Sequence, residues 1–453
     1  MHIRILALLF FLSATAAHCA DLTPGQGKSD GFPAEVLARQ HFDRAPLPSI
    51  DEAIAKAMVA ARAAAMPLID AAFHDRGRRL LVPAEYPSIQ QALDTADAGD
   101  TVVVRPGTYS EHLFIRDGIK LVSDAGPDND AEVLVEGARL TLPQRALITI
   151  IDGSYDNASP VGMLNFSQGA GRHTIVDGFT IRNMPRQNHH LPAHTHAVNL
   201  RGASPVIMNC YVRDNGSTGI GNHVAYLDQN APMAERDFRQ ANIETPAAAV
   251  VFHNIVRNNF GRGIGCNHFA TTLLAGNEVM ANDDSGLEEK AGPGIGIKHG
   301  ARPTVVGNVV HDNPYGGIKI KFGEPQGKFD VDRQPSAEVR ANVLFQNGDQ
   351  PNLTCAGCGV DSQPAIITGN YLFESAVAGI SLVNKTNAIV EENIVSGCRN
   401  SGIVVNDSHL VRLNRNLIAN AKNNGLMVSK SSTVDEMIDN TAFAIEGQAF
   451  LQK

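Results

Sequence analysis

Asparagine recurs at a nearly constant spacing along the second half of the chain, and this repeat limits the folds open to it. Three of the spacings are 23 residues, and most of these asparagines are followed nine or ten residues later by Gly and an apolar residue. Short runs of alternating apolar residues lie between them, separated by Asn, Gly and Asp, without a helical period. A fixed period of this length indicates one supersecondary unit stacked on itself, here a β-solenoid of short parallel strands. The repeated residues are Asn209, Asn254, Asn277, Asn308, Asn342, Asn370, Asn393, Asn416 and Asn440.

Length, charge and the asparagines themselves fit this interpretation. A chain of 453 residues ordinarily suggests two or more domains, but a solenoid grows along one axis and remains one unit. An inward Asn at the same corner of successive coils can stack its amide on the next and satisfy backbone groups, so we assign these residues no chemistry. The net charge of −9 argues against nucleic acid as a partner.

The first 20 residues are interpreted as a secretory signal. A charged start, an apolar run over residues 5–12 and small residues over 13–17 follow the pattern of such signals. Cys19 keeps a lipoprotein alternative open. The apolar run is too short to cross a bilayer, and no other stretch reaches 18 apolar residues. We therefore expect a secreted or periplasmic protein with no membrane partner.

The cysteines beyond the signal are few. Cys355 and Cys358 are separated by two residues, a spacing that fits either a metal or redox pair or a small disulfide loop. An oxidising compartment favours the disulfide loop, which is the prediction. The full set is Cys210, Cys266, Cys355, Cys358 and Cys398.

The region before the repeats is expected to hold a leader and a helix. Residues 21–46 are predicted to be extended or poorly ordered, and the Ala-rich residues 51–73 have the period of a helix. The predicted organisation is a signal over residues 1–20, a leader and helix over 21–80, and a β-helix over 81–445.

A second, short helix is predicted where the coils begin. Ser88 caps an amphipathic segment that ends at Ala96, and a strand over residues 101–104 follows. Such a helix plugs the open end of a solenoid, where the core and a sheet edge would otherwise be exposed. With the repeats behind it, this segment resembles the right-handed parallel β-helix proteins of the pectin-lyase-like superfamily, over roughly residues 80–440. The resemblance implies an all-β fold, a right-handed parallel β-helix with an N-terminal helical cap. It does not select a reaction, because the superfamily includes polysaccharide lyases, glycosidases, epimerases, esterases and noncatalytic proteins.

Alignment on the repeated Gly-Ile corner assigns a direction to each side chain of the strand that follows. Ile220, Ile264 and Ile295 face inward, since alternate residues of a strand face opposite sides. Lys319 faces outward. Neighbouring coils are about 4.8 Å apart, so outward cations repel one another unless an anion lies across them, and we predict an anionic ligand. The aligned outward positions begin basic and end neutral: Arg201, His223, Asn267, Lys298, Lys321, Val383, Asn406 and Ser429.

Histidines and long loops surround these basic positions. His268 and His299 end their strands. Two other strands of the same alignment are followed by long segments, residues 226–249 and 324–336. Such loops are expected to form the walls of a groove. The alternative is that scattered Lys and His residues only serve solubility. Four further histidines precede the first of these strands: His189, His190, His194 and His196.

An anionic polysaccharide of uronic acids fits such a groove. Its eliminative cleavage needs cations against the carboxylate, a base for the C5 proton and an acid for the leaving oxygen, and C5 epimerisation uses the same carbanion. Lys298 is the predicted base, because Lys319 and Lys321 lower its pKa. The other predicted catalytic residues are His223, His299 and Tyr315, and the predicted substrate-binding residues are Arg201, Asn267, His268, Lys319 and Lys321.

Two further interpretations of the acidic loop around Asp283 and Asp284 remain open, a glycoside hydrolase site and a Ca²⁺ site. Asp283–Asp284 followed by Lys298–His299–Gly300 faintly resembles polygalacturonase-type glycosidases. The family's Gly-His-Gly is Lys-His-Gly here, and a third separated Asp is missing. Alternatively, Asp283 and Asp284 hold Ca²⁺ that neutralises substrate.

A noncatalytic function is the alternative of a different class. The repeat pattern is also similar to that of periplasmic β-helix proteins that accompany copper-enzyme maturation. In that case His194 and His196, with neighbouring histidines, bind a transition metal. A monomer is favoured under every interpretation.

Overall fold

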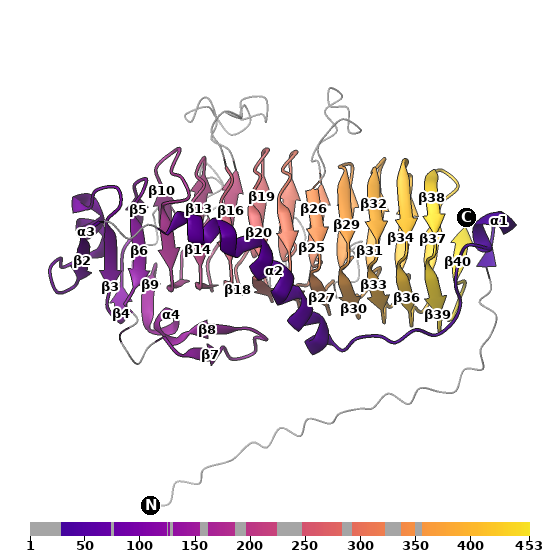
Figure 1. The fold of residues 1–453 in the computed structure, drawn as a ribbon, viewed down its shortest axis with the longest axis horizontal. Coiled ribbons are helices and arrows are strands. Elements are labelled where there is room, and N and C mark those ends of the chain that lie inside the picture. Colours follow the sequence, from indigo (N-terminus) through magenta and orange to yellow (C-terminus); the bar gives the residue numbers. More distant parts are fainter. Residues whose placement is uncertain are drawn as a thin grey trace, which may run out of the picture.

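The computed structural model describes residues 29–73, 77–124, 126, 130–154, 162–185, 196–223, 247–282, 292–321, 337–348 and 356–453. These residues form one elongated stack of coils whose short strands build three long parallel sheets (Figure 1). A single antiparallel hairpin stands outside the three sheets among the described residues.

The three sheets run the length of the stack, and each coil passes through sheet A, then C, then B. Sheet A consists of β1 (Ser29–Asp30), β5 (Leu113–Ile115), β10 (Leu164–Phe166), β13 (Val198–Arg201), β16 (Ile220–His223), β19 (Ile264–Asn267), β22 (Ile295–Lys298), β25 (Ile318–Lys321), β28 (Cys358–Asp361), β31 (Ile380–Val383), β34 (Ile403–Asn406), β37 (Leu426–Val428) and β40 (Phe450–Gln452). Sheet B consists of β4 (Gly107–Tyr109), β9 (Thr149–Asp152), β12 (Thr180–Arg182), β15 (Tyr211–Arg213), β18 (Ile255–Arg257), β21 (Glu278–Met280), β24 (Val309–His311), β27 (Val343–Phe345), β30 (Tyr371–Phe373), β33 (Ile394–Ser396), β36 (Leu417–Ala419) and β39 (Thr441–Phe443). Sheet C consists of β2 (Arg79–Val82), β3 (Thr101–Val104), β6 (Lys120–Ser123), β11 (Ile175–Asp177), β14 (Val206–Met208), β17 (Val250–Phe252), β20 (Leu273–Ala275), β23 (Thr304–Val306), β26 (Ala337–Arg340), β29 (Ala365–Thr368), β32 (Ala388–Glu391), β35 (Val411–Asn414) and β38 (Val434–Ile438). The hairpin is β7 (Glu132–Leu134) with β8 (Thr141–Pro143), and the helices are α1 (Ala34–Leu37), α2 (Ile50–Ala72), α3 (Ile89–Thr95) and α4 (Gln144–Ile148).

Columns of apolar side chains fill the interior of the coils. Ile264, Ile295 and Ile318 are paired in register along sheet A, and each is at most 1% exposed. Burying one such side chain contributes about 1.5–3 kcal/mol, and the column repeats through the stack. The predicted inward direction of these residues is confirmed.

An asparagine ladder runs along the corner that leads into sheet B. The side-chain amide of Asn277 donates to Oδ1 of Asn308 at 3.0 Å and to the Val251 carbonyl at 2.9 Å. Its own Oδ1 accepts from the backbone and side chain of Asn254. The same bonds continue coil by coil, so the structural role predicted for these residues is confirmed for eight of the nine. The ladder comprises Asn254, Asn277, Asn308, Asn342, Asn370, Asn393, Asn416 and Asn440.

The ninth asparagine lies outside the ladder. The backbone amide of Cys210 makes the bond to Asn254 that a ladder residue would make, and the Asn209 side chain donates instead to Asp177. Asn209 has a left-handed φ of 53° and precedes the ladder position by one residue. A second ladder, which was not predicted from the sequence, lies five residues further on in each coil: Asn215, Asn259, Asn282, Asn313 and Asn347.

Helix α2 confirms the helix predicted over residues 51–73 and lies along the outside of sheets B and C (Figure 1). Ser49 and Glu52 form a capping box at its start. Its buried face is mostly alanine, which allows a close approach to the coils at Gly276 and Gly307. No helix among the described residues is long and apolar enough to cross a membrane.

Helix α3 is the predicted cap of the first coil. Ser88 is its N-cap, its side chain accepts from the backbone amide of Gln91, and the helix ends where Ala96 was predicted to end it. Ile89, Ala92 and Leu93 are buried in the solenoid core. The strand predicted over residues 101–104 is β3.

The segment over residues 29–41 corrects the expectation of a poorly ordered leader. It returns to the far end of the stack and forms a last coil there (Figure 1). In sheet A β1 pairs in parallel with β40, and on the sheet B side His41 bridges to Thr441. Gln40 accepts from the backbone and side-chain amides of Asn440 and so ends the asparagine ladder. Residues 29–41 pack against strands that lie about 400 residues later in the chain. No neighbouring repeat in the sequence therefore marks them as a coil, which is why a leader was predicted.

The described cysteines are interior residues. Cys210, Cys266, Cys358 and Cys398 are free and buried, and burial raises the pKa of each thiol to about 12. The predicted disulfide loop is therefore wrong at Cys358, whose side chain joins the inward column of sheet A between Ile318 and Ile380. Its partner in that prediction, Cys355, lies outside the described residues.

Candidate functional site

The outer face of sheet A gathers the predicted basic residues where strands β13–β28 end. In register, Arg201 pairs with His223, His223 with Asn267, and Lys298 with Lys321. The intervening strands β19 and β22 pair in the same register. We call the outward positions Arg201, His223, Asn267, Lys298 and Lys321 the basic strip. The predicted alignment of these positions on one face is confirmed.

Lys298 is the most perturbed member of the basic strip. Its side chain is half-buried, and its pKa is lowered to about 7. The largest cause is the positive charge of Arg262, followed by burial and by the charges of Lys319 and Lys321. The direction predicted from the two lysines is confirmed, but the main cause is a residue that was not predicted from the sequence. Arg262 lies between Gly261 and Gly263 in the turn before β19, outside the strand alternation that identified the others.

Four histidine rings form a row beside the strip. The ring centroids of His196 and His223 are 6.2 Å apart, those of His223 and His268 are 5.9 Å apart, and His268 stacks on His299 at 4.7 Å with an interplanar angle of 12°. Nε of Arg201 lies 3.5 Å from Nε2 of His223. His223 is only 3% exposed, whereas His268 and His299 are half-buried in left-handed turn conformations. The two turn histidines therefore contact solvent next to Lys298.

A carboxylate ends the basic strip. Asp361 pairs in register with Lys321, and its carboxylate lies 3.4 Å from Nζ of that lysine. Burial opposes ionisation of Asp361, but hydrogen bonds from Asn384 and Ser362 and the charge of Lys321 outweigh it, so its pKa is lowered. This position was not predicted from the sequence, because the strand follows a lengthened loop.

The remaining predicted site residues are Tyr315 and three residues outside the described part of the chain. Tyr315 is 6% exposed and lies in the turn before β25, six residues ahead of Lys321 in the chain. Asp283, Asp284 and His194 lie outside the described residues, so the proposed Ca²⁺ and transition-metal ligands stay predictions there. Within the described residues, no group of three or more His, Cys, Asp or Glu side chains is arranged to hold a metal ion.

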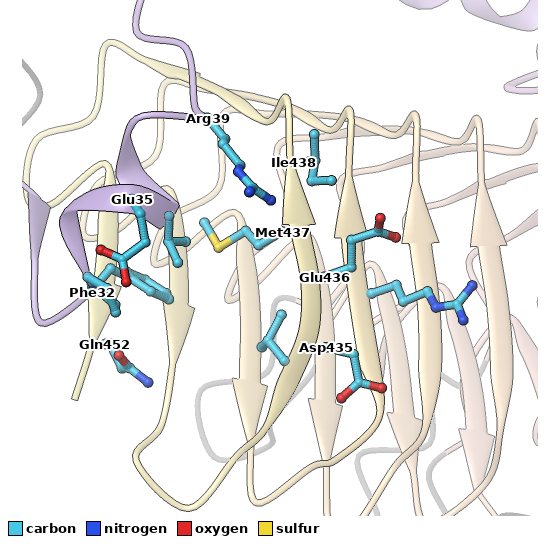
Figure 2. A pocket seen from close by; sticks show the side chains of 12 residues that line it. Phe32, Glu35, Arg39, Asp435, Glu436, Met437, Ile438 and Gln452 are labelled. Carbon is cyan, nitrogen blue, oxygen red and sulfur yellow. The ribbon is translucent and has the colours of Figure 1, made fainter.

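A separate groove of about 720 Å³ lies at the other end of the molecule, between α1 and β38. Figure 2 shows Arg39 and Glu35 on one side of it and Asp435 and Glu436 on the other. The groove exists because the last coil has a short helix where the other coils have a strand of sheet C. It carries mixed charge and none of the basic strip, so the candidate site remains the outer face of sheet A.

Comparison with known proteins identifies the architecture. The family described as protein of unknown function (DUF1565) matches residues 83–350, and the family described as right handed beta helix region matches residues 326–443. No curated protein matches the sequence significantly. The expected all-β, right-handed parallel β-helix with a helical cap is confirmed.

Several solved structures are similar to this chain at low sequence identity. Gene product 12 of bacteriophage phi29 aligns with a TM-score of 0.50 at 9% identity, covering 81% of this chain and 55% of that one. The Azotobacter vinelandii mannuronan C-5 epimerase AlgE6 A-module has a TM-score of 0.45 at 14% identity, covering 81% and 93%. The catalytic unit of the GH87 alpha-1,3-glucanase from Streptomyces thermodiastaticus has 0.45 at 14%, covering 85% and 69%. At 9% identity the likeness to gene product 12 supports the fold alone, and a fold of this kind hosts many reactions.

Proposed function

We propose a function for this chain, which belongs to the DUF1565 family of proteins of unknown function: it binds an anionic uronic-acid polysaccharide and removes the C5 proton of a sugar, as a lyase or a C5 epimerase. The observation that carries the proposal is a group of four cationic side chains, Arg262, Lys298, Lys319 and Lys321, on a protein of net charge −9. The charge of Arg262, burial, and the charges of the other two lysines lower the pKa of Lys298 to about 7. Such a local excess of positive charge favours an anionic ligand.

The chemistry requires a base that is uncharged at neutral pH and cations that stabilise a developing negative charge. With a pKa of about 7, the Lys298 amine is close to half neutral at pH 7 and can accept the C5 proton. The uronate carboxylate takes up charge as that proton leaves, and neighbouring cations such as Lys319 and Lys321 stabilise it. The half-buried surface limits competing solvation, which strengthens these interactions.

Cleavage and epimerisation diverge once the C5 proton has been removed. Epimerisation returns a proton to the opposite face of C5, whereas cleavage protonates the leaving oxygen. The stacked pair His268 and His299 lies beside Lys298 and supplies the proton donor in this proposal. Tyr315, which is only 6% exposed in the turn before β25, is the weaker candidate.

The test is a panel of pectate, alginate and glycosaminoglycan incubated with the full chain in deuterated buffer. Ultraviolet-absorbing unsaturated products identify a lyase, and deuterium at C5 without chain shortening identifies an epimerase. Activity is expected to rise as pH passes through about 7, because only the neutral amine accepts a proton. A chelator-treated sample tests the predicted Ca²⁺ or transition-metal requirement.

Two variants provide the controls. Lys298→Met is expected to lower the rate about a hundredfold or more, while Lys422→Met, at an exposed turn remote from the strip, leaves it unchanged. The absence of both unsaturated product and C5 exchange on every polymer would refute the proposed function. Export remains a prediction that depends on residues 1–20.

A further inference from the structure

A column of glycines forms part of the outer face of sheet A, one position away from the basic strip. Gly221, Gly265 and Gly296 occupy equivalent outward positions on β16, β19 and β22, and Gly359 occupies it on β28. Among the five strands from β16 to β28, only β25 places a side chain there, that of Lys319, whereas β13 and β31 on either side carry Asn199 and Ser381. Missing side chains at an outward position leave room for a side chain from elsewhere to lie against the backbone.

Two of these glycines are covered by a side chain from the turn of the preceding coil. The ring of His196, two residues before β13, occupies the space that a Cβ at Gly221 would need. Arg262, two residues before β19, covers Gly296 in the same way: an added Cβ would lie 2.7 Å from its Nε. Arg262 also passes Gly292, where an added Cβ would lie 2.5 Å from its Cγ. The arginine therefore extends flat across the next coil toward Lys298.

We propose that Arg262 is a positioning residue of the candidate site: laid across Gly292 and Gly296, its guanidinium disfavours the charged form of the Lys298 amine. The glycines are part of the device, because a methyl group at Gly296 would force the arginine out of this position. The role of Arg262 in turnover rests on the proposed function, whereas its effect on the charge of Lys298 does not.

The groups around Lys298 support this assignment. Lys319 and Lys321 approach from β25, His299 follows Lys298 in the chain, and His268 stacks on that histidine from the coil of β19. The described carboxylate nearest in register is Asp361, which lies one coil further on and pairs with Lys321. Arg262 is the largest of the causes that lower the pKa of Lys298, ahead of both lysines. An arginine guanidinium also keeps its charge across the whole pH range of the experiment below.

The experiment measures the protonation of Lys298 directly. The full chain is treated with a trace of an amine-reactive acylating reagent between about pH 5 and pH 10, and modification of the Lys298 peptide is followed by mass spectrometry. In the wild type the midpoint is expected near pH 7. Arg262→Gln is expected to raise the midpoint by about one pH unit or more, which is about tenfold slower modification at pH 6.

Gly296→Ala tests the position of Arg262 apart from its charge. The variant retains the arginine, but the added methyl group pushes the side chain out of its place beside Lys298. Its midpoint is expected to rise in the same direction as that of Arg262→Gln. Gly359→Ala is the matched control, because a Cβ there has nothing closer than 3.8 Å, and its midpoint should stay at the wild-type value. Circular dichroism and thermal unfolding confirm that each variant is folded.

The outcomes are distinguishable. If folded Arg262→Gln or Gly296→Ala leaves the midpoint at the wild-type value, or if wild-type Lys298 titrates like an ordinary lysine, the inference is overturned. If the midpoints move as expected while no polymer is processed, the inference stands and the proposed function fails. If Arg262→Gln does not fold, Gly296→Ala decides.

Discussion

At the residue scale, the asparagine ladder replaces water as the partner of buried backbone groups. Asn308 is fully buried and donates to the carbonyls of Leu274 and Val306 and to Oδ1 of Asn342. Its Oδ1 accepts from Asn277. Each amide is thus nearly saturated, and loss of one side chain removes hydrogen bonds to the coils on both sides.

Asn308→Ala is therefore expected to lower the free energy of unfolding by about 2–4 kcal/mol, because several buried polar groups each lose a hydrogen-bond partner. Urea unfolding measures the change. Asn423→Ala is the control, since that side chain is exposed and makes one hydrogen bond to Asn400; it should cost less than about 1 kcal/mol. Equal losses in the two variants would contradict the ladder as a source of stability.

Lys298 also predicts a pH dependence of stability that does not involve any substrate. The pKa of Lys298 is about 7 in the folded protein, compared with 10.5 for an ordinary lysine such as that of the unfolded chain. Between these two pH values the unfolded chain therefore binds a proton that the folded chain lacks. The free energy of unfolding should therefore rise with pH across this interval, by up to about 1.4 kcal/mol per pH unit. Below about pH 7 the full cost of the charged amine is present.

Lys298→Met removes this contribution. Compared with wild type, the variant should be most stabilised at or below about pH 7 and lose that advantage as pH approaches 10. Denaturant unfolding at a series of pH values measures the difference. A difference that does not vary with pH would show that Lys298 titrates normally.

The residues of the candidate site that lie within strands were predictable from the alternation of side chains, whereas the residue that lies in a turn was not. The alternation of β16, β22 and β25 placed His223, Lys298 and Lys321 on one face from the sequence alone. Arg262 reaches that face from a turn, where a residue's direction depends on local backbone angles and on the glycines of the next coil. No spacing rule connects a turn residue to Gly296, 34 positions later.

At the scale of elements, α2 depends on two glycines far from it in the chain. Gly276 and Gly307 have left-handed φ angles of 59° and 64°, and a Cβ at Gly307 would lie 2.7 Å from the Cβ of Ala61 and collide with the carbonyl of Ala57. The helix itself was predictable from its alanine period and its cap at Ser49. Its docking site was not, because the complementary glycines lie more than 200 residues later.

Gly307→Ala is expected to weaken the docking of α2. A matched control is Gly369→Ala, at a φ of 62° with no atom within 4 Å of the added Cβ, which incurs only the backbone strain. The first variant should lose about 1–3 kcal/mol more than the second, since overpacking adds to the strain. Urea unfolding gives the energies, and hydrogen exchange locates the change. Similar losses, with unchanged exchange in α2, would show that the contact contributes little.

At the scale of the whole molecule, residues 29–41 close the end of the stack that would otherwise expose β39 and β40. Open sheet edges promote association between molecules, and natural β-proteins cover them. Gly31 has a φ of 82°, and an added Cβ there would meet the carbonyl of Gln452. This coil was not predictable from the repeat, because a linker and α2 follow it in the sequence rather than another coil.

Gly31→Val should therefore detach the last coil and make the protein associate more strongly than the wild type as its concentration increases. Gly169→Val is the control, with a φ of 83° and no atom within 4 Å of the added Cβ. Sedimentation velocity over a range of concentrations measures the association. A Gly31→Val protein that sediments like the control would indicate that the segment does not protect the edge.

The pairing of β1 with β40 has a consequence for biosynthesis. A ribosome releases residues 29–41 before any other described part of the chain, yet their binding surface exists only after Phe450 has been added. Until then this stretch has no native partner, and a prematurely terminated chain retains an uncovered end. Closure of the solenoid is thus coupled to the synthesis of β39 and β40, so residues 29–41 dock only after most of the described chain has left the ribosome.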